Sequence, residues 1–135
     1  MNTSDWDLIT QDLRNDLDPD RMAAAAARLH ASATPEDIPK LRELLGDKSF
    51  FVREAAAWPL AELAGAACLS ELLRAYQRGL DDGNDNDGFS AALIDLAQSD
   101  PRMVEALVAL THSDDKALRG NAQWLLTFCA PGKDA

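Results

Sequence analysis

The chain has 135 residues and a formal net charge of −10 at pH 7. Its 24 Ala and 20 Leu far outnumber its three Val and three Ile, and this bias toward good helix formers excludes a β-rich fold. An apolar share of 47% is enough for a packed core and excludes a disordered chain. Such acidity repels phosphate backbones and anionic lipid surfaces, so we expect neither a nucleic acid nor a membrane as partner.

The sequence carries few signals of membrane insertion, export or disulfide bonding. No apolar run approaches the roughly 20 residues that span a bilayer. Residues 1–5 have neither the basic start nor the apolar stretch of an export signal. The two cysteines, Cys68 and Cys129, are too few to staple a fold. These features predict a cytoplasmic protein with reduced thiols.

The spacing of apolar residues predicts about eight helices and no strand. In the first half of the chain, Ser4 is expected to cap a helix that runs to Leu17. Asp18-Pro19 then supplies a cap and a first-turn proline for an Ala-rich helix to about residue 31. Further helices are predicted over residues 35–45 and 50–64.

The second half of the chain continues the same pattern. A helix is predicted from Leu69 to about Gly79, followed by an acidic loop rich in Gly and Asn over residues 80–88. Three more helices are predicted over residues 89–98, 103–110 and about 116–128. Residues 131–135 are predicted to form a loose tail.

An internal repeat organises these helices. The segments 52–60 and 118–126 carry Arg, Ala, Trp and Leu at matching positions. The two segments are 66 residues apart in the sequence. Half of this offset, 33 residues, separates Leu60 from Leu93 and Leu93 from Leu126. A period of about 32 residues, with a pair of helices in each unit, is typical of a solenoid.

The repeat units resemble the HEAT-like family, in its short phycobilisome-lyase form. Asp47 precedes Val52-Arg53 and a pair of alanines, and Asp114 precedes Leu118-Arg119. The resemblance covers residues 18–130, although Asn86 stands where the third unit should carry Arg. It implies an all-α, short right-handed solenoid of about 3.5–4 helical hairpins. Residues 1–17 would then form an N-terminal capping helix, and residues 131–135 a tail.

The resemblance also assigns structural roles. In this family the Asp and Arg of each unit hold neighbouring repeats together, which would make the corresponding residues here structural rather than catalytic. Trp58 and Trp124 occupy equivalent places beside the Ala faces of their helices, and packing between repeats is their expected role. The predicted structural residues are Asp47, Arg53, Asp114, Arg119, Trp58 and Trp124.

Motifs for catalysis or metal binding are lacking. The sequence has no His-Glu-x-x-His, Cys-x-x-Cys or Gly-x-Ser-x-Gly, and no Gly-rich phosphate loop with Lys. His112 lies near Asp114 without a nucleophile. The loop 81–88 lacks the first carboxylate and the final Glu of an EF-hand. We therefore expect no enzymatic activity, no cofactor and no metal.

The acidic residues suggest a binding surface. In a stack of helix pairs, the connections between repeats emerge on one edge, and capping explains about one acid per helix start. Charge in excess of that need steers association with a basic partner. The alternative contact is the concave face, through Arg74, Tyr76, Lys40, Glu43, Gln77 and Glu105. Ten aspartates are expected along this edge, and those predicted to bind the partner are Asp81, Asp82, Asp85, Asp87, Asp114 and Asp115.

The expected function is that of a non-enzymatic protein–protein interaction module with a basic protein as partner. One alternative is an immunity-type inhibitor of a cationic toxin. Another is an accessory protein that handles a bilin or other cofactor, as the lyase-type relatives do. The sequence leaves open whether the acidic edge or the concave face binds, and which oligomeric state the protein adopts.

Overall fold

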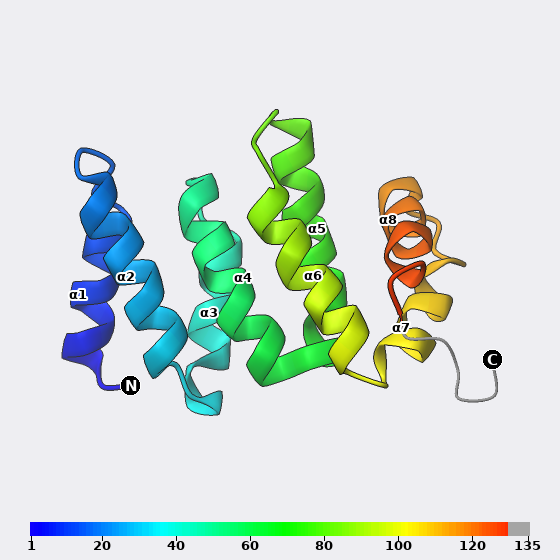
Figure 1. The fold of residues 1–135 in the computed structure, drawn as a ribbon, viewed down its shortest axis with the longest axis horizontal. Coiled ribbons are helices and arrows are strands. Elements are labelled where there is room, and N and C mark those ends of the chain that lie inside the picture. The colour runs from blue at the N-terminus through cyan, green and yellow to red at the C-terminus, as the bar shows by residue number, and fades with distance from the viewer. Residues whose placement is uncertain (130–135) are drawn as a thin grey trace. The chain divides into compact units, whose positions relative to one another are not determined.

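The computed structural model describes residues 1–129, and its regular elements in that range are all helices (Figure 1). The prediction of an all-helical protein is thereby confirmed. The chain folds as two compact units, residues 1–64 and a second that begins at Gly65. This division falls inside the predicted repeat array of residues 18–130. The predicted tail, residues 131–135, lies outside the described residues.

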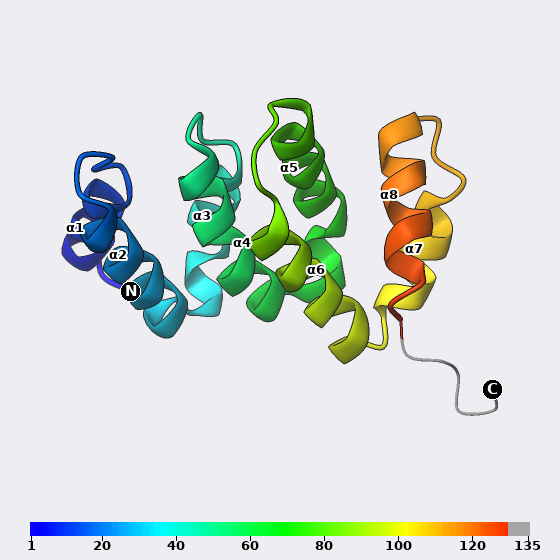
Figure 2. The same ribbon diagram turned by 45° about the horizontal axis from the view of Figure 1, so that its top comes forward.

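The first unit contains four α-helices and one 3₁₀ turn. α1 packs against α2, α2 against α4, and α3 against α4 (Figures 1 and 2). Leucines from all four helices are buried between them, including Leu13, Leu29, Leu41 and Leu60. In chain order the elements are α1 (Thr3–Leu13), α2 (Pro19–Ser32), the turn Pro35–Asp37, α3 (Ile38–Leu45) and α4 (Phe50–Ala64).

The start and end of α1 correct the prediction. Asn2 rather than Ser4 caps the helix, because the Asp5 N–H donates to the Asn2 Oδ1 at 2.8 Å. The helix ends at Leu13 and leaves Leu17 92% exposed. Residues that precede a proline-initiated helix are disfavoured in the α conformation, so the chain turns before Pro19.

The second helix begins as predicted. The Arg21 N–H donates to the Asp18 Oδ1 at 3.1 Å, and Pro19 takes the first helical position. Thr34 and Asp37 form a capping box at the next start, where the Thr34 N–H donates to the Asp37 Oδ2 at 2.8 Å. α4 spans the predicted residues Phe50–Ala64 and holds Pro59 in its interior.

Over its described residues, 65–129, the second unit begins with a 3₁₀ turn and continues with four helices. α5 packs against α6 and α8, while α7 contacts α6 and α8. Phe89, Leu93, Met103 and Leu107 are among its fully buried side chains. The elements are the turn Gly65–Cys68, α5 (Leu69–Asp81), α6 (Asp87–Ser99), α7 (Met103–Leu110) and α8 (Lys116–Leu126).

The predicted number of about eight separate helices is corrected to seven. Because α4, the turn Gly65–Cys68 and α5 follow one another without a break, the described residues form seven continuous helical segments. The longest of them, Phe50–Asp81, has 32 residues and is long and apolar enough to cross a membrane. More than half of its most apolar window is buried inside the protein, as in the core helix of a soluble protein.

The end of α5 also differs from the prediction. Gly79 was expected to end this helix, but it is buried inside it, and the helix continues to Asp81. The terminating residue is Gly83, with φ +75°. The Asn84 N–H donates to the Gly79 carbonyl at 2.9 Å and the Gly83 N–H to the Leu80 carbonyl at 3.1 Å. This is the Schellman arrangement, which requires a left-handed residue and therefore favours glycine.

Candidate functional site

The C-terminal end of α5 and the N-terminal start of α8 form a pocket in the second unit. The two helices pack against each other, and the pocket between them has a volume of about 230 Å³. We call it the acidic pocket, because three of its lining residues are exposed aspartates. Its lining is Asp81, Asp82, Asp115, Arg74, Arg78, Gln77, Leu73, Leu118 and Ala117.

Asp115 has two roles in this pocket. As the N-cap of α8, its Oδ1 accepts from the Ala117 N–H at 2.9 Å and from the Leu118 N–H at 3.1 Å. These bonds satisfy two of the N–H groups that a helix start leaves without partners. They also fix the carboxylate at the side of the pocket formed by α8.

A chain of side-chain amides holds Asp81 in place. The Asn121 Nδ2 donates to the Gln77 Oε1 at 3.0 Å, and the Gln77 Nε2 donates to the Asp81 Oδ1 at 2.8 Å. α8 is thereby linked through α5 to the pocket carboxylate. The sequence predicts Gln77 on the alternative concave face and gives no signal for Asn121.

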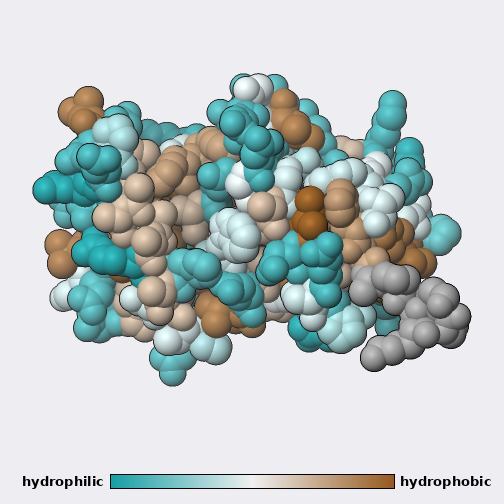
Figure 3. Space-filling model, in the orientation of Figure 1, coloured by the Kyte–Doolittle hydropathy of each residue, from teal (hydrophilic) through white to brown (hydrophobic). Residues whose placement is uncertain are grey.

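The remaining predicted edge acids lie outside the acidic pocket. Asp85, Asp87 and Asp114 are exposed, and none of the three lines it. The Asp87 N–H donates to the Asp85 Oδ1 at 3.0 Å, which organises the start of α6. The surface at this end of α5 is largely hydrophilic (Figure 3), although Leu80 is 45% exposed there. The structure therefore brings together three of the six predicted aspartates.

Arg74 and Tyr76, two of the three predicted contact residues of α5, have different surroundings. Arg74 is exposed and lines the acidic pocket. Tyr76 is only 8% exposed, and its ring stacks on that of Trp124 with centroids 5.4 Å apart and planes 4° apart. Tyr76 thus belongs to the core of the second unit, because it shares the apolar face of α5 with Leu72 and Leu73.

Asp47 and Arg53 both make hydrogen bonds within the first unit. The Arg14 Nη2 donates to the Asp47 Oδ1 at 2.8 Å, and the Ser49 N–H donates to its Oδ2 at 2.9 Å. Burial raises the pKa of Asp47, but the Ser49 N–H and the Arg14 guanidinium outweigh it, so the pKa lies below its ordinary value. Arg53 is 1% exposed, and its Nη1 donates to the carbonyls of Asp47 and Lys48.

In the second unit, Arg119 and Trp124 also have protein partners, whereas Asp114 is exposed. The Arg119 Nη1 donates to the Ser113 carbonyl at 2.9 Å. In the register that pairs Arg119 with Arg53, Ser113 rather than Asp114 corresponds to Asp47. Trp124 is half-buried between Tyr76 and Phe128, whose ring meets it edge-on at 5.5 Å.

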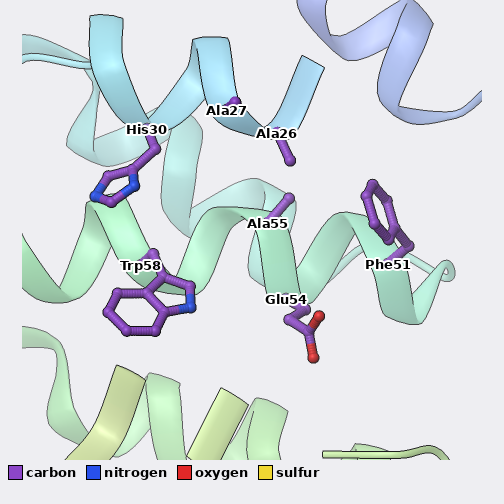
Figure 4. Close-up of a pocket in the computed structure, with 7 residues that line it drawn as sticks. All are labelled: Ala26, Ala27, His30, Phe51, Glu54, Ala55 and Trp58. Atoms are coloured by element: carbon purple, nitrogen blue, oxygen red, sulfur yellow. The ribbon is translucent and has the colours of Figure 1, made fainter. Parts of the chain in front are cut away.

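Trp58 lines a second pocket, which lies in the first unit between α2 and α4 (Figure 4). We call it the aromatic pocket; its volume is about 250 Å³. Trp58 is predicted to pack between repeats, and its side chain is half-buried. The centroid of the His30 ring lies 6.1 Å from that of Trp58. The lining residues are Ala26, Ala27, His30, Phe51, Glu54, Ala55 and Trp58.

Residues 1–129 contain no group of three or more His, Cys, Asp or Glu that could hold a metal ion. Burial raises the pKa of the Cys129 thiol, which disfavours its reactive thiolate. Comparisons with protein-family models, curated proteins and solved structures found no match for this chain. A functional assignment therefore rests on its own residues.

Proposed function

We propose that the protein is a non-enzymatic interaction module that binds a basic protein through the acidic pocket. The observation that carries this proposal is the meeting of three carboxylates, Asp81, Asp82 and Asp115, in one pocket. A Lys or Arg side chain suits such a site, because its aliphatic stem can cover apolar atoms while its charged end meets carboxylates. Leu73 and Leu118 supply the apolar part of the lining.

Charge supports a basic partner at longer range as well. The chain carries 23 acidic and 13 basic residues, and a surplus of one sign accelerates encounter with a partner of the other. Arg74 and Arg78 also line the acidic pocket. These two arginines would bind an acidic group of the same partner and so set its orientation. A site that presents both positive and negative side chains gives specificity, because the partner must carry the complementary pattern of charge.

We further propose that the helices are HEAT-like repeats arranged as a short right-handed solenoid of about 3.5–4 hairpins. Capping contacts at equivalent positions of the two matching segments support this proposal. The Ser49 Oγ accepts from the Val52 N–H at 3.4 Å, and the Asp115 Oδ1 accepts from the Leu118 N–H at 3.1 Å. Both bonds run from the cap to the third helical residue, as repeated units would make them.

Pocket size favours a protein partner over a cofactor. The pockets described above, of about 230 and 250 Å³, are smaller than the roughly 300–1,000 Å³ of small-molecule sites. They match single side chains better than a bilin. An immunity-type inhibitor of a cationic toxin is a more specific form of the proposal, supported by the same acidity.

The test compares two triple variants with the same change in charge. The first is D81N/D82N/D115N, in which the α8 cap is kept because asparagine is as good an N-cap as aspartate. The control is D7N/D20N/D95N, which alters three exposed aspartates outside the acidic pocket. A basic protein that co-purifies from the native cell is titrated against each variant at low and at high salt.

We expect the first triple variant to weaken binding about tenfold or more at low salt, because three charge pairs of roughly 0.5–1 kcal/mol are lost. Its affinity should also depend less on salt than that of the control. If both triple variants bind equally well and with the same salt dependence, the acidic pocket is not the binding site.

A further inference from the structure

The aromatic pocket is built from three rings and a floor of small residues. Phe51 and Trp58 project from α4, and His30 projects from α2 (Figure 4). Between them the lining consists of the small side chains of Ala26, Ala27 and Ala55, which leave the space open. In Figure 3 the outward face of α2 beside this space is moderately hydrophobic, in keeping with its exposed alanines.

Positive charge on α2 and α4 is directed away from the aromatic pocket. The Arg28 Nη2 lies 3.0 Å from the Asp12 Oδ2, and the Arg21 Nε lies 3.9 Å from the Asp12 Oδ1. Arg53 is buried against main-chain carbonyls, as described above. None of these three arginines lines the pocket.

The polar side chains of the lining are Glu54 and His30. The His30 Nε2 lies against the Glu62 Oε1, so a second carboxylate stands next to the pocket. The aromatic pocket therefore combines ring faces with carboxylates. Ring faces attract cations through their quadrupole, and carboxylates pair with guanidinium groups in a forked geometry.

We propose that the aromatic pocket binds an arginine side chain from an exposed segment of a partner protein. Arginine is favoured because its planar guanidinium stacks on Trp and also pairs with a carboxylate. A volume of about 250 Å³ suits one long side chain rather than a larger ligand. This site is separate from the acidic pocket, so it stands even if the proposed function fails there.

The experiment is a titration with the blocked peptide Ac-Gly-Arg-Gly-NH₂, followed through the three Trp indole N–H resonances of the full chain. The Trp58 resonance is assigned by its loss in Trp58→Phe. Matched peptides carry citrulline, which is uncharged, or norleucine, which is only apolar. Trp6 and Trp124 serve as internal references, because neither lines the aromatic pocket.

We expect the arginine peptide to shift the Trp58 resonance in a saturable manner, leaving Trp6 and Trp124 in place. The citrulline and norleucine peptides should give less than a fifth of this shift. An unmoved Trp58 resonance at millimolar peptide, or equal shifts with all three peptides, would overturn the proposal.

Two variants test the lining without removing a ring. Glu54→Gln should weaken the arginine peptide at least threefold, whereas Glu36→Gln, an exposed change in the turn Pro35–Asp37, should leave its affinity unchanged. Ala27→Lys places a cation at the pocket from an exposed helical position and should abolish binding. Equal affinities for all three variants and the native chain would contradict the assignment.

Discussion

Arg53 and Arg119 occupy equivalent positions in the two matching segments and make the same hydrogen bond. Each Nη1 donates at 2.9 Å to the main-chain carbonyl six residues earlier, that of Asp47 in one case and of Ser113 in the other. In both units the bond ties the start of a helix to the turn before it. The two differ in burial, since Arg53 is 1% exposed whereas Arg119 is half-buried.

This difference in burial predicts unequal effects of the same substitution. Arg53→Lys should lower the free energy of unfolding by about 2–4 kcal/mol, because an ammonium cannot reproduce the guanidinium geometry at a buried site. Arg119→Lys should lower it by about 1 kcal/mol or less, since water can replace the lost bond. Urea unfolding of both variants measures the difference. Similar losses would mean that burial does not set the importance of these arginines.

Asp100 should make stability dependent on pH under acidic conditions. The Arg102 side chain, at 2.9 Å, lowers the pKa of Asp100; burial raises it, and the N–H groups of Arg102 and Ala66 lower it further, to about 2 from an ordinary 3.8. A pKa lowered by folding means that the carboxylate stabilises the fold above about pH 4, and that this contribution is lost as the pH falls toward 2.

Asp100→Asn should therefore destabilise the protein at neutral pH by about 1–2 kcal/mol, a modest value because the exposed Arg102 is screened by solvent. Below pH 2 the variant and the native chain should be nearly equally stable. Thermal unfolding across the acidic range provides the measurement. A variant whose deficit stays constant from pH 7 to pH 2 would show that the charge of Asp100 is unimportant.

Gly65 should not tolerate a side chain. Its φ is +59°, and a Cβ at this position would lie 2.5 Å from the Asp100 Oδ2 and 2.8 Å from the Arg102 Nη2. Gly65→Ala should lower the free energy of unfolding by about 1–3 kcal/mol, because the backbone is strained and the ion pair must move.

Gly120 provides a control in which the same substitution should increase stability. It lies within α8, and a Cβ there would meet nothing within 4 Å. Gly120→Ala should raise the free energy of unfolding by about 0.5–1 kcal/mol, because Ala favours the helix interior over Gly. Both variants are compared by thermal unfolding. If they change stability in the same direction, the strain assigned to Gly65 is wrong.

Asn86 should anchor the acidic loop. Its side chain is 7% exposed, and its Nδ2 donates to the Tyr76 carbonyl at 2.9 Å. Asn86→Ala should cost about 1–3 kcal/mol of stability and increase amide hydrogen exchange in residues 82–87, because a buried carbonyl loses its donor. Asn84→Ala, in the same loop but half-buried, should cost less. Unchanged exchange in Asn86→Ala would show that the loop is held by other contacts.

Local sequence signals predicted the helices where they were unambiguous. α4 and α7 have their expected bounds, because a helix-start signal precedes each of them, residues 47–49 before α4 and Asp100-Pro101 before α7. At α5 either Gly79 or Gly83 could end the helix. Gly79 is buried by tertiary packing and stays helical, so the helix is terminated at Gly83. Leu17 continues the apolar spacing of α1 by chance. It lies in the turn after the helix, where its side chain is exposed.

The candidate sites were predictable only in part. The repeat pattern predicted Asp81, Asp82 and Asp115 on one edge, but the pocket that these three residues line depends on the packing of α5 against α8, which no local pattern encodes. A signal for the aromatic pocket did exist. His30 and Glu62 are 32 residues apart, which equals the period predicted from the sequence, so a repeat of this length would place them at the same position of successive units.

The bond between Asn86 and Tyr76 has a consequence for recognition. It fastens the far end of the segment that follows α5, while the Schellman turn at Gly83 fastens its near end. A segment that is held at both ends loses little conformational entropy when a ligand binds to it. The carboxylates it carries are in this sense preorganised, and more of their attraction to a cationic surface remains as affinity.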